Sequence, residues 1–278
     1  MHVHIATASR RVGLGLIGAA LIFFAATPAQ AQISERESSR RPLGADYRIE
    51  FSGTLWYPTL NGVISSEQFG IIGDQIEFTT DLGYQQTRFG DMRLVLRPSR
   101  KSKFRVQYTP ITYRASTDFK RDIVFNGIKF PVAIPVESTF EWKVLRIGYE
   151  YDFVSTSRGF VGLLLEGRYT QFRSELTSVV ADEFSVVKVP LPAIGAVGRV
   201  YVIPEVAVDF EVSAFKFPDV DPKYQANYFD WDIHGTFNFT DNVGVQVGWR
   251  RMTSFINIEQ DTGDLKFQGM WFGAAVRY

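Results

Sequence analysis

Apolar and polar residues alternate one by one along most of this chain. In YRIEFSGTLWY (47–57), aromatic and aliphatic side chains occupy one phase, and arginine, glutamate, serine and threonine occupy the other. KFRVQYT (103–109) and YFDWDIHGTFNF (228–239) repeat the pattern. Successive side chains of a β-strand point to opposite faces, so each stretch predicts a strand with one apolar and one polar face.

Segments of this kind recur along the chain and predict an all-β fold. We expect ten strands, with 8 to 12 compatible with the pattern, at 46–57, 89–97, 103–114, 139–153, 159–173, 193–202, 206–216, 228–239, 243–254 and 267–278. Short connections (98–102, 154–158, 203–205, 240–242) alternate with long ones (58–88, 115–138, 174–192, 217–227, 255–266). An antiparallel up-and-down barrel with tight turns at one end and loops at the other has this spacing.

Two local features complete the pattern. In the segment 139–153 the apolar phase changes between Val144 and Ile147. A β-bulge near Leu145 explains the change, and so does a strand that leaves the membrane there. Within the long connection 115–138, Asn126-Gly127 predicts a type I′ hairpin turn.

The N-terminus has the features of a secretory signal peptide. Arg10 and Arg11 precede an apolar run of about 15 residues, and Ala29 and Ala31 form a small-residue cleavage site. The run is shorter than the roughly 20 residues of a membrane-spanning helix. We therefore expect a signal peptide at 1–31, a flexible periplasmic lead-in at 32–45 and a barrel at 46–278 in an exported bacterial protein.

Composition narrows the function classes. Removing the signal peptide takes away Arg10 and Arg11 and no acidic residue, which leaves 28 basic against 30 acidic residues. This balance argues against a nucleic-acid partner. The chain has no cysteine, which excludes disulfides and thiolate chemistry.

Alternation alone leaves open which face meets water. A soluble secreted β-protein buries its apolar face, whereas an outer-membrane barrel turns that face toward lipid. Charged residues in mid-strand and aromatic residues toward strand ends favour the membrane. The aromatic share of the chain is 15%.

The last strand adds a third argument. WFGAAVRY resembles the C-terminal recognition signal of bacterial outer-membrane barrels, with Gly273, Val276 and the terminal Tyr278 at the expected places. Trp271 departs from that pattern, which prefers a polar residue there. The resemblance implies that assembly machinery recognises this strand, which then pairs with the first strand and removes both free edges. From Asp46 to Tyr278 the chain resembles, in architecture, the small outer-membrane β-barrel proteins of Gram-negative bacteria, and no motif identifies a subfamily.

Three functions fit these features. The first is an outer-membrane barrel that has a structural role, or that passes or binds small solutes in a porin-like manner. It would contact outer-membrane lipid and lipopolysaccharide, meet the barrel-assembly machinery during biogenesis and act as a monomer. The alternatives are a membrane-embedded barrel enzyme acting on lipid or peptide, and a soluble secreted β-protein.

Catalytic chemistry is weakly indicated. His234 is the one histidine of the mature chain and shares a strand face with Asp230, Asp232 and Thr236. Lipid A deacylases, which pair a histidine with a serine two residues later, resemble this loosely, although Thr236 stands at that place. Same-face neighbours on one strand are about 7 Å apart, which makes a weak site. We expect a histidine hydrogen-bonded to neighbouring carboxylates, with no enzyme activity, cofactor or metal.

The polar strand faces predict a charged lumen. The basic residues expected there are Arg48, Arg93, Arg97, Lys103, Arg105, Arg146, Arg168, Arg199, Arg250 and Arg277. The acidic residues are Glu50, Glu150, Asp152, Glu166, Asp209, Glu211, Asp230 and Asp232. Because unpaired charges in a narrow interior are costly, we expect a largely ion-paired, plugged lumen.

Overall fold

The computed structural model describes residues 41–66, 73–132, 134–179, 182–217, 224–258 and 261–278. The predicted signal peptide and most of the lead-in lie outside these residues, so their boundaries stay predictions. Within the described part, no helix is long and apolar enough to cross a membrane.

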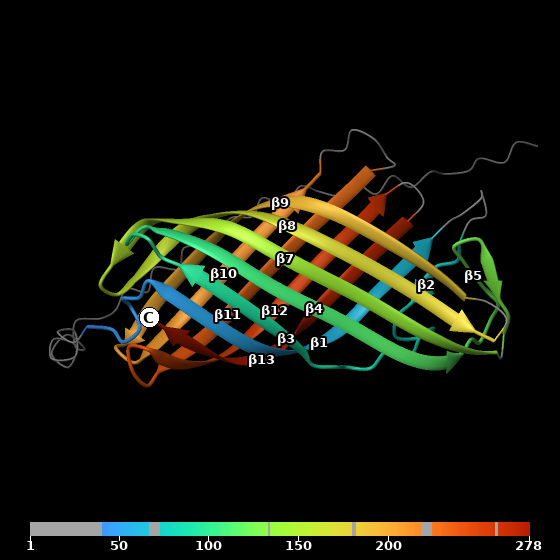
Figure 1. The fold of residues 1–278 in the computed structure, drawn as a ribbon, viewed down its shortest axis with the longest axis horizontal. Coiled ribbons are helices and arrows are strands. Elements are labelled where there is room, and N and C mark those ends of the chain that lie inside the picture. The colour runs from blue at the N-terminus through green and yellow to red at the C-terminus, as the bar shows by residue number, and fades with distance from the viewer. Residues whose placement is uncertain (1–40, 67–72, 133, 180–181, 218–223, 259–260) are drawn as a thin grey trace, which may run out of the picture. The chain divides into compact units, whose positions relative to one another are not determined.

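Ten long antiparallel strands form a closed barrel (Figure 1). They are β1 (Ile49–Ser66), β3 (Phe89–Leu96), β4 (Ser102–Asp118), β7 (Pro135–Thr156), β8 (Gly159–Ser178), β9 (Asp182–Ile203), β10 (Val206–Lys216), β11 (Tyr224–Asn238), β12 (Val243–Ile258) and β13 (Asp261–Arg277). The two-residue β2 (Ile76–Glu77) pairs with β1, and β5 (Ile123–Phe125) pairs with β6 (Ile128–Phe130). The predicted all-β, up-and-down, ten-stranded barrel is confirmed.

The first and last strands close the barrel. β1 and β13 pair from Glu50↔Arg277 to Ser66↔Asp261. The backbone N–H of Tyr278 also donates to the carbonyl of Ile49 at 2.8 Å. This pairing removes the free edges of the first and last strands, which lipid could not satisfy.

The two ends of the barrel differ. At the end called here the turn end, on the left of Figure 1, the connections are 97–101, 157–158, 204–205 and 239–242. At the opposite, loop end, β2 lies in the connection from β1 to β3, and the β5–β6 hairpin lies in the connection from β4 to β7 (Figure 1). Asn126 (φ 49°) and Gly127 (φ 78°) form the predicted hairpin turn.

The prediction of two long loops is wrong. The ranges 174–192 and 255–266 are mostly strand, because β8 runs on to Ser178, β9 starts at Asp182, β12 ends at Ile258 and β13 starts at Asp261. Pro190 and Pro192 lie within β9, where they are exposed on its outer face and lie opposite Tyr169 and Gly167 in the sheet.

The strands turn apolar side chains outward, whereas the strands of a soluble β-sandwich turn them inward. Apolar side chains on the outer face are exposed, among them Phe51, Leu55, Phe104, Ile147, Leu163, Leu165, Ile233, Val245 and Phe272. The inner face is buried and divides into two parts. Toward the turn end lies a charged layer composed of Glu50, Lys103, Arg105, Arg146, Glu150, Glu166, Arg168, Glu211, Asp230 and Arg250. Toward the loop end lies an aromatic layer composed of Trp56, Phe78, Phe89, Tyr113, Phe140, Trp142, Tyr228 and Phe267.

This division resolves the phase change in β7. Phe140, Trp142, Val144 and Arg146 all point inward without a break in register. The strand has no bulge near Leu145, and its one register shift lies between Asp152 and Val154. The apolar phase changes because the strand passes from the aromatic layer, where its inner face is apolar, to the lipid-facing zone, where its outer face is apolar.

Candidate functional site

Glu211 on β10 forms ion pairs with two arginines from the far side of the barrel. Arg146 on β7 places Nη2 2.5 Å from its Oε1, and Arg105 on β4 donates to its Oε2. β8 and β9 separate β7 from β10 in the sheet, so these ion pairs cross the interior. Each partner is at most 9% exposed. The charged layer therefore ties opposite walls together.

Asp230 on β11 is a second junction. Arg250 on β12 donates to it at 3.1 and 2.7 Å, and Arg168 on β8 approaches at 3.4 Å. The hydroxyl of Tyr228 donates to the same carboxylate at 3.0 Å. Arg146 bonds to Glu166 at 2.8 Å and lies 3.5 Å from Asp230, which links the two junctions.

A third junction was missed by the sequence interpretation. Asp91 on β3 accepts the amide of Gln107 at 2.8 Å and the hydroxyl of Thr109, and lies 3.5 Å from Arg250. Asp91 shares the inward phase with Arg93, so strand phase alone contained the signal needed to find it.

Further ion pairs lie nearer the turn end. Their contacts are Lys103–Glu150 at 2.5 Å, Lys103–Asp152 at 2.9 Å, Arg199–Asp209 at 2.5 Å and Arg277–Glu50 at 2.5 Å.

Three expected members of the network behave differently. Arg48 is exposed and precedes β1, so its expected place in the lumen is wrong. Arg97 lies at the rim, where it donates to the carbonyls of Ala45 and Arg100, and this corrects its placement inside the network. Arg93 is only partly buried and lies 3.7 Å from Glu211.

His234 lies in the lumen near the turn end. Its Nδ1 is 2.6 Å from Oδ1 of Asp232, and its Nε2 is 3.5 Å from Oδ2 of Asp209. Trp271 donates to the other oxygen of Asp232 at 2.5 Å. The hydroxyl of Thr236 donates to Asp209 at 3.2 Å rather than to the histidine. A histidine oriented by carboxylates is present, but no hydroxyl nucleophile is paired with it here.

No cluster of three or more His, Cys, Asp or Glu suited to a metal occurs in the described part of the chain. Asp230 contacts three arginines, whereas Asp232 contacts His234 and Trp271. Of the four weak catalytic candidates, Asp230 therefore belongs to an ion-pair junction and Asp232 is hydrogen-bonded to His234. Thr236 is hydrogen-bonded to Asp209 instead.

The aromatic layer lies inside the barrel, on the loop-end side of the charged layer. Trp142 lies 4.9 Å from the ring centroids of both Phe172 and Phe267, and Trp56 lies 6.2 Å from Phe267. Arg250 approaches the face of Trp56 at 5.3 Å, where the two layers meet. The sequence interpretation missed this layer, although the inward phase of Phe140, Trp142 and Val144 in β7 was its signal.

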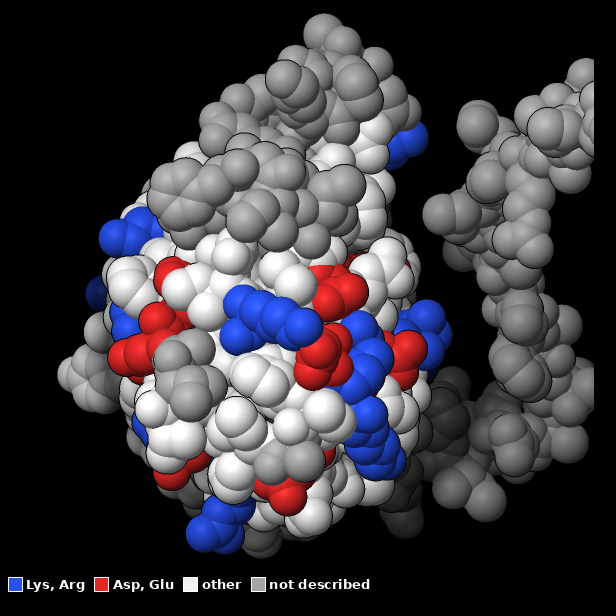
Figure 2. All heavy atoms as spheres, turned by 90° about the vertical axis from the view of Figure 1, so that its right-hand side faces the viewer, with Lys and Arg blue, Asp and Glu red and all other residues white. Residues whose placement is uncertain are grey.

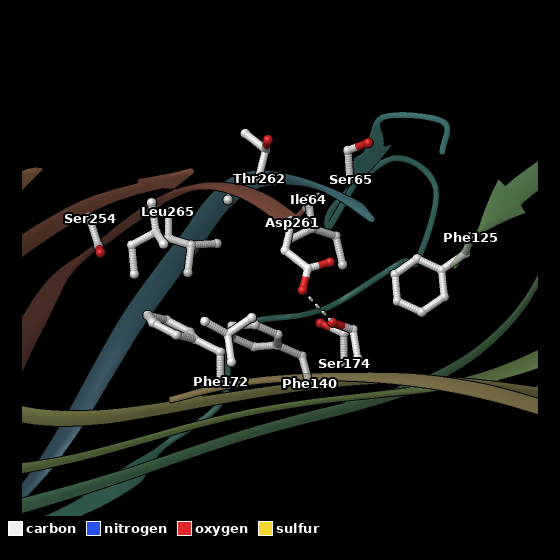
Figure 3. Close-up of a pocket in the computed structure, with 14 residues that line it drawn as sticks. Ile64, Ser65, Phe125, Phe140, Phe172, Ser174, Ser254, Asp261, Thr262 and Leu265 are labelled. Carbon is white, nitrogen blue, oxygen red and sulfur yellow. Dashed lines mark hydrogen bonds between the residues drawn. The ribbon is translucent and has the colours of Figure 1, made fainter. Parts of the chain in front are cut away.

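Beyond the aromatic layer, a pocket opens at the loop end (Figure 3). It contains about 500 Å³ of empty space, including space open to solvent. Figure 3 shows Phe140 and Phe172 on one wall and Leu265 and Ile64 on the opposite wall. It shares no lining residue with the two cavities of the charged layer, which contain about 360 and 460 Å³.

The β5–β6 hairpin forms part of the pocket. Phe125 lines it, while Asn126 donates to Glu183 on β9 at 2.6 Å. A hydrogen bond from Lys129, then one from the backbone N–H of Val132, hold the pKa of the exposed Asp122 carboxyl below its usual range. Charges of both signs are interspersed across this end (Figure 2).

The residues of the expected assembly signal lie at the barrel seam. Gly273 faces Thr54, and a Cβ atom there would lie 2.5 Å from Thr54 Cγ2 and 2.8 Å from the carbonyl oxygen of Gly53. Val276 and Tyr278 are exposed. Recognition by assembly machinery stays a prediction.

Comparison with protein-family models and with curated proteins finds no match. Among solved structures, the outer membrane protease OmpT from Escherichia coli is similar, with a TM-score of 0.56, 8% identity, and coverage of 87% of this chain and 100% of that one. Neisserial surface protein A (13% identity, TM-score 0.35) covers 83% of this chain and 97% of its own. The Ail protein of Yersinia pestis (8% identity, TM-score 0.35) covers 81% and 99%. The chain has the fold of the small bacterial outer-membrane β-barrels.

Proposed function

We propose that this chain is an integral outer-membrane barrel that binds small solutes at its loop end and does not pass them through its lumen. The single observation that carries this proposal is the set of ion pairs that cross the interior from Arg105 and Arg146 to Glu211. Removing these charges from water is tolerable only while they remain paired. A solute crossing this layer would have to separate them.

The aromatic layer supports the same conclusion. Phe267 packs against both Trp56 and Trp142 between the charged layer and the loop-end pocket. A path through the barrel would cross both an apolar block and an ion-paired block. Barrels of about eight strands are filled by their side chains, and open aqueous channels occur at about 16 strands.

The orientation follows from the connections. We place the turn end in the periplasm and the loop end outside, because outer-membrane barrels have short periplasmic turns and longer outer loops. The exposed apolar side chains of the outer face then lie in lipid, and lipopolysaccharide surrounds the loop end. With its apolar face turned to lipid and its sheet closed, the barrel needs no second copy, so we expect a monomer.

A barrel enzyme is the second candidate. The contact of His234 with Asp232 at 2.6 Å and the fold shared with a protease favour it. The burial of His234 (6% exposed) and the engagement of Thr236 with Asp209 weigh against it. Loss of a lipid-modifying or proteolytic activity on substituting His234 would support the enzyme.

Solute uptake into proteoliposomes tests the main proposal. We expect liposomes containing the folded protein to exclude small sugars to the same extent as liposomes without protein. Swelling at the rate given by a general porin, at equal protein content, would refute a closed lumen.

A further inference from the structure

The loop-end pocket has the composition of a ligand site. Its lining combines seven apolar side chains with six polar ones, and small-molecule sites likewise combine apolar walls with polar groups. The apolar part consists of Ile64, Phe125, Phe140, Phe172, Val187, Ile256 and Leu265. Most of these belong to the strands and hairpin that extend the barrel at the loop end, so the pocket is not part of the charged lumen.

Ser254 on β12 is the first specific feature. Its side chain is 2% exposed and lines the pocket, and its Oγ has no hydrogen-bond partner among the residues that the structure describes. Burying a hydroxyl without a partner is unfavourable. A ligand atom that accepts a hydrogen bond from Ser254 would remove that cost.

Gly263 on β13 is the second feature. A Cβ built on this glycine meets no atom of the described residues within 4 Å, although the position faces the interior and lines the pocket. On the same strand, a Cβ on Gly269 or Gly273 would lie within 3 Å of neighbouring atoms. The space next to Gly263 is therefore pocket space that a larger side chain could fill.

Asp261 sets the charge preference. It lines the pocket, and its Oδ2 accepts the hydroxyl of Ser185 at 3.0 Å. No lysine or arginine is among the described residues that line the pocket. A carboxylate without a lining cation disfavours an anionic ligand.

We propose that this pocket binds a small neutral molecule with an apolar body and one hydrogen-bond-accepting oxygen, such as an aliphatic ketone. The apolar body occupies the space between the Phe140–Phe172 wall and the Ile64–Leu265 wall, and the oxygen accepts from Ser254. This inference rests on the proposed function, because it names the ligand class of the binding end of the barrel.

Calorimetry with 2-heptanone tests the proposal on the full-length folded protein in lipid nanodiscs, with empty nanodiscs as the reference for partition into lipid. We expect saturable binding. Ser254→Ala should weaken it about threefold to tenfold, the range expected for one hydrogen bond to a neutral acceptor. Gly263→Leu should abolish it by filling the pocket.

Matched variants on the same strands provide the controls. Thr253→Ala removes a hydroxyl from the opposite face of β12, and Asp264→Leu adds bulk on the exposed face of β13. Both should bind 2-heptanone as the unchanged protein does. Heptanoate, which has the same chain length and a negative charge, should bind at least about tenfold more weakly.

Several outcomes would overturn the inference. These are no saturable binding, binding unaffected by both Ser254→Ala and a folded Gly263→Leu, or heptanoate binding as tightly as the ketone. Failure of the proposed closed lumen can be told apart from failure of this site. A barrel that conducts and binds 2-heptanone would refute the closed lumen but support the site. A closed barrel that does not bind the ketone would refute the site alone.

Discussion

Arg146 on β7 and Glu211 on β10 meet across the barrel, with Nη2 of the arginine 2.5 Å from Oε1 of the glutamate. Two strands lie between β7 and β10 in the sheet, so the contact spans the interior instead of following its wall. Arg105 reaches the same carboxylate from β4. A single glutamate thus joins two buried cations that come from different strands.

Removing that glutamate should destabilise the fold strongly. We expect Glu211→Gln to lower the free energy of unfolding by about 3–5 kcal/mol, because Arg105 and Arg146 would keep their burial and lose a compensating charge. Urea unfolding in detergent micelles measures this. Glu175→Gln is the control: its pair with Arg173 is about one-third exposed and should contribute no more than about 1 kcal/mol. Equal effects of the two substitutions would contradict the ion-paired layer.

Closure of the barrel should depend on Gly273. We expect Gly273→Val to reduce the fraction of protein that folds, because a side chain there would collide with Thr54 and the backbone of Gly53. Folded barrels migrate faster on SDS gels when unheated, and the ratio of the two bands gives the folded fraction. Gly53→Val is the matched control, since its Cβ meets nothing within 4 Å among the described residues and it lies in the same seam. A normal folded fraction for Gly273→Val would show that the seam tolerates the added bulk.

The orientation can be tested by cysteine labelling, because the chain has no cysteine of its own. Lys129→Cys places a thiol on the exposed β6 at the loop end, and Lys101→Cys places one in a turn-end connection. A membrane-impermeant maleimide added to intact cells should label the first and spare the second. After disruption of the outer membrane both should react. The reverse pattern on intact cells would place the turn end outside.

His234 should be dispensable for any lipid-modifying or proteolytic phenotype. His234→Ala removes a ring held between Asp232 and Asp209, and no nucleophile among the described residues is paired with that ring. We expect the mass of lipid A and the cleavage of added peptides to match those of cells with the unchanged protein. A change in either readout, with the variant still folded by gel mobility, would establish the enzyme in place of the binding barrel.

The alternation of side chains along the strands predicted more of the structure than the pattern of short and long connections did. Alternation placed Arg105, Glu150, Arg168 and Glu211 on inward faces, and the structure buries all four. It could not state that Glu211 receives Arg105 and Arg146, since pairing across the lumen depends on the shear and closure of the barrel. The error at Arg48 arose because alternation continues for a residue before β1 begins.

The loop-end interior was harder to predict for a physical reason. There the strands rise beyond the lipid-facing zone, so apolar residues such as Trp142 point inward and the simple rule of apolar out and polar in reverses along a single strand. The pocket also needs Phe125 from the β5–β6 hairpin, whose position over the barrel no local pattern determines.

Single-channel recording in planar bilayers tests the closed lumen most directly. The purified, folded barrel should insert without the stable, large conductance steps of a general porin, because paired charges and packed aromatic rings fill its interior. Stable conductance at the level of a general porin, from protein shown to be folded by its gel mobility, would contradict the account.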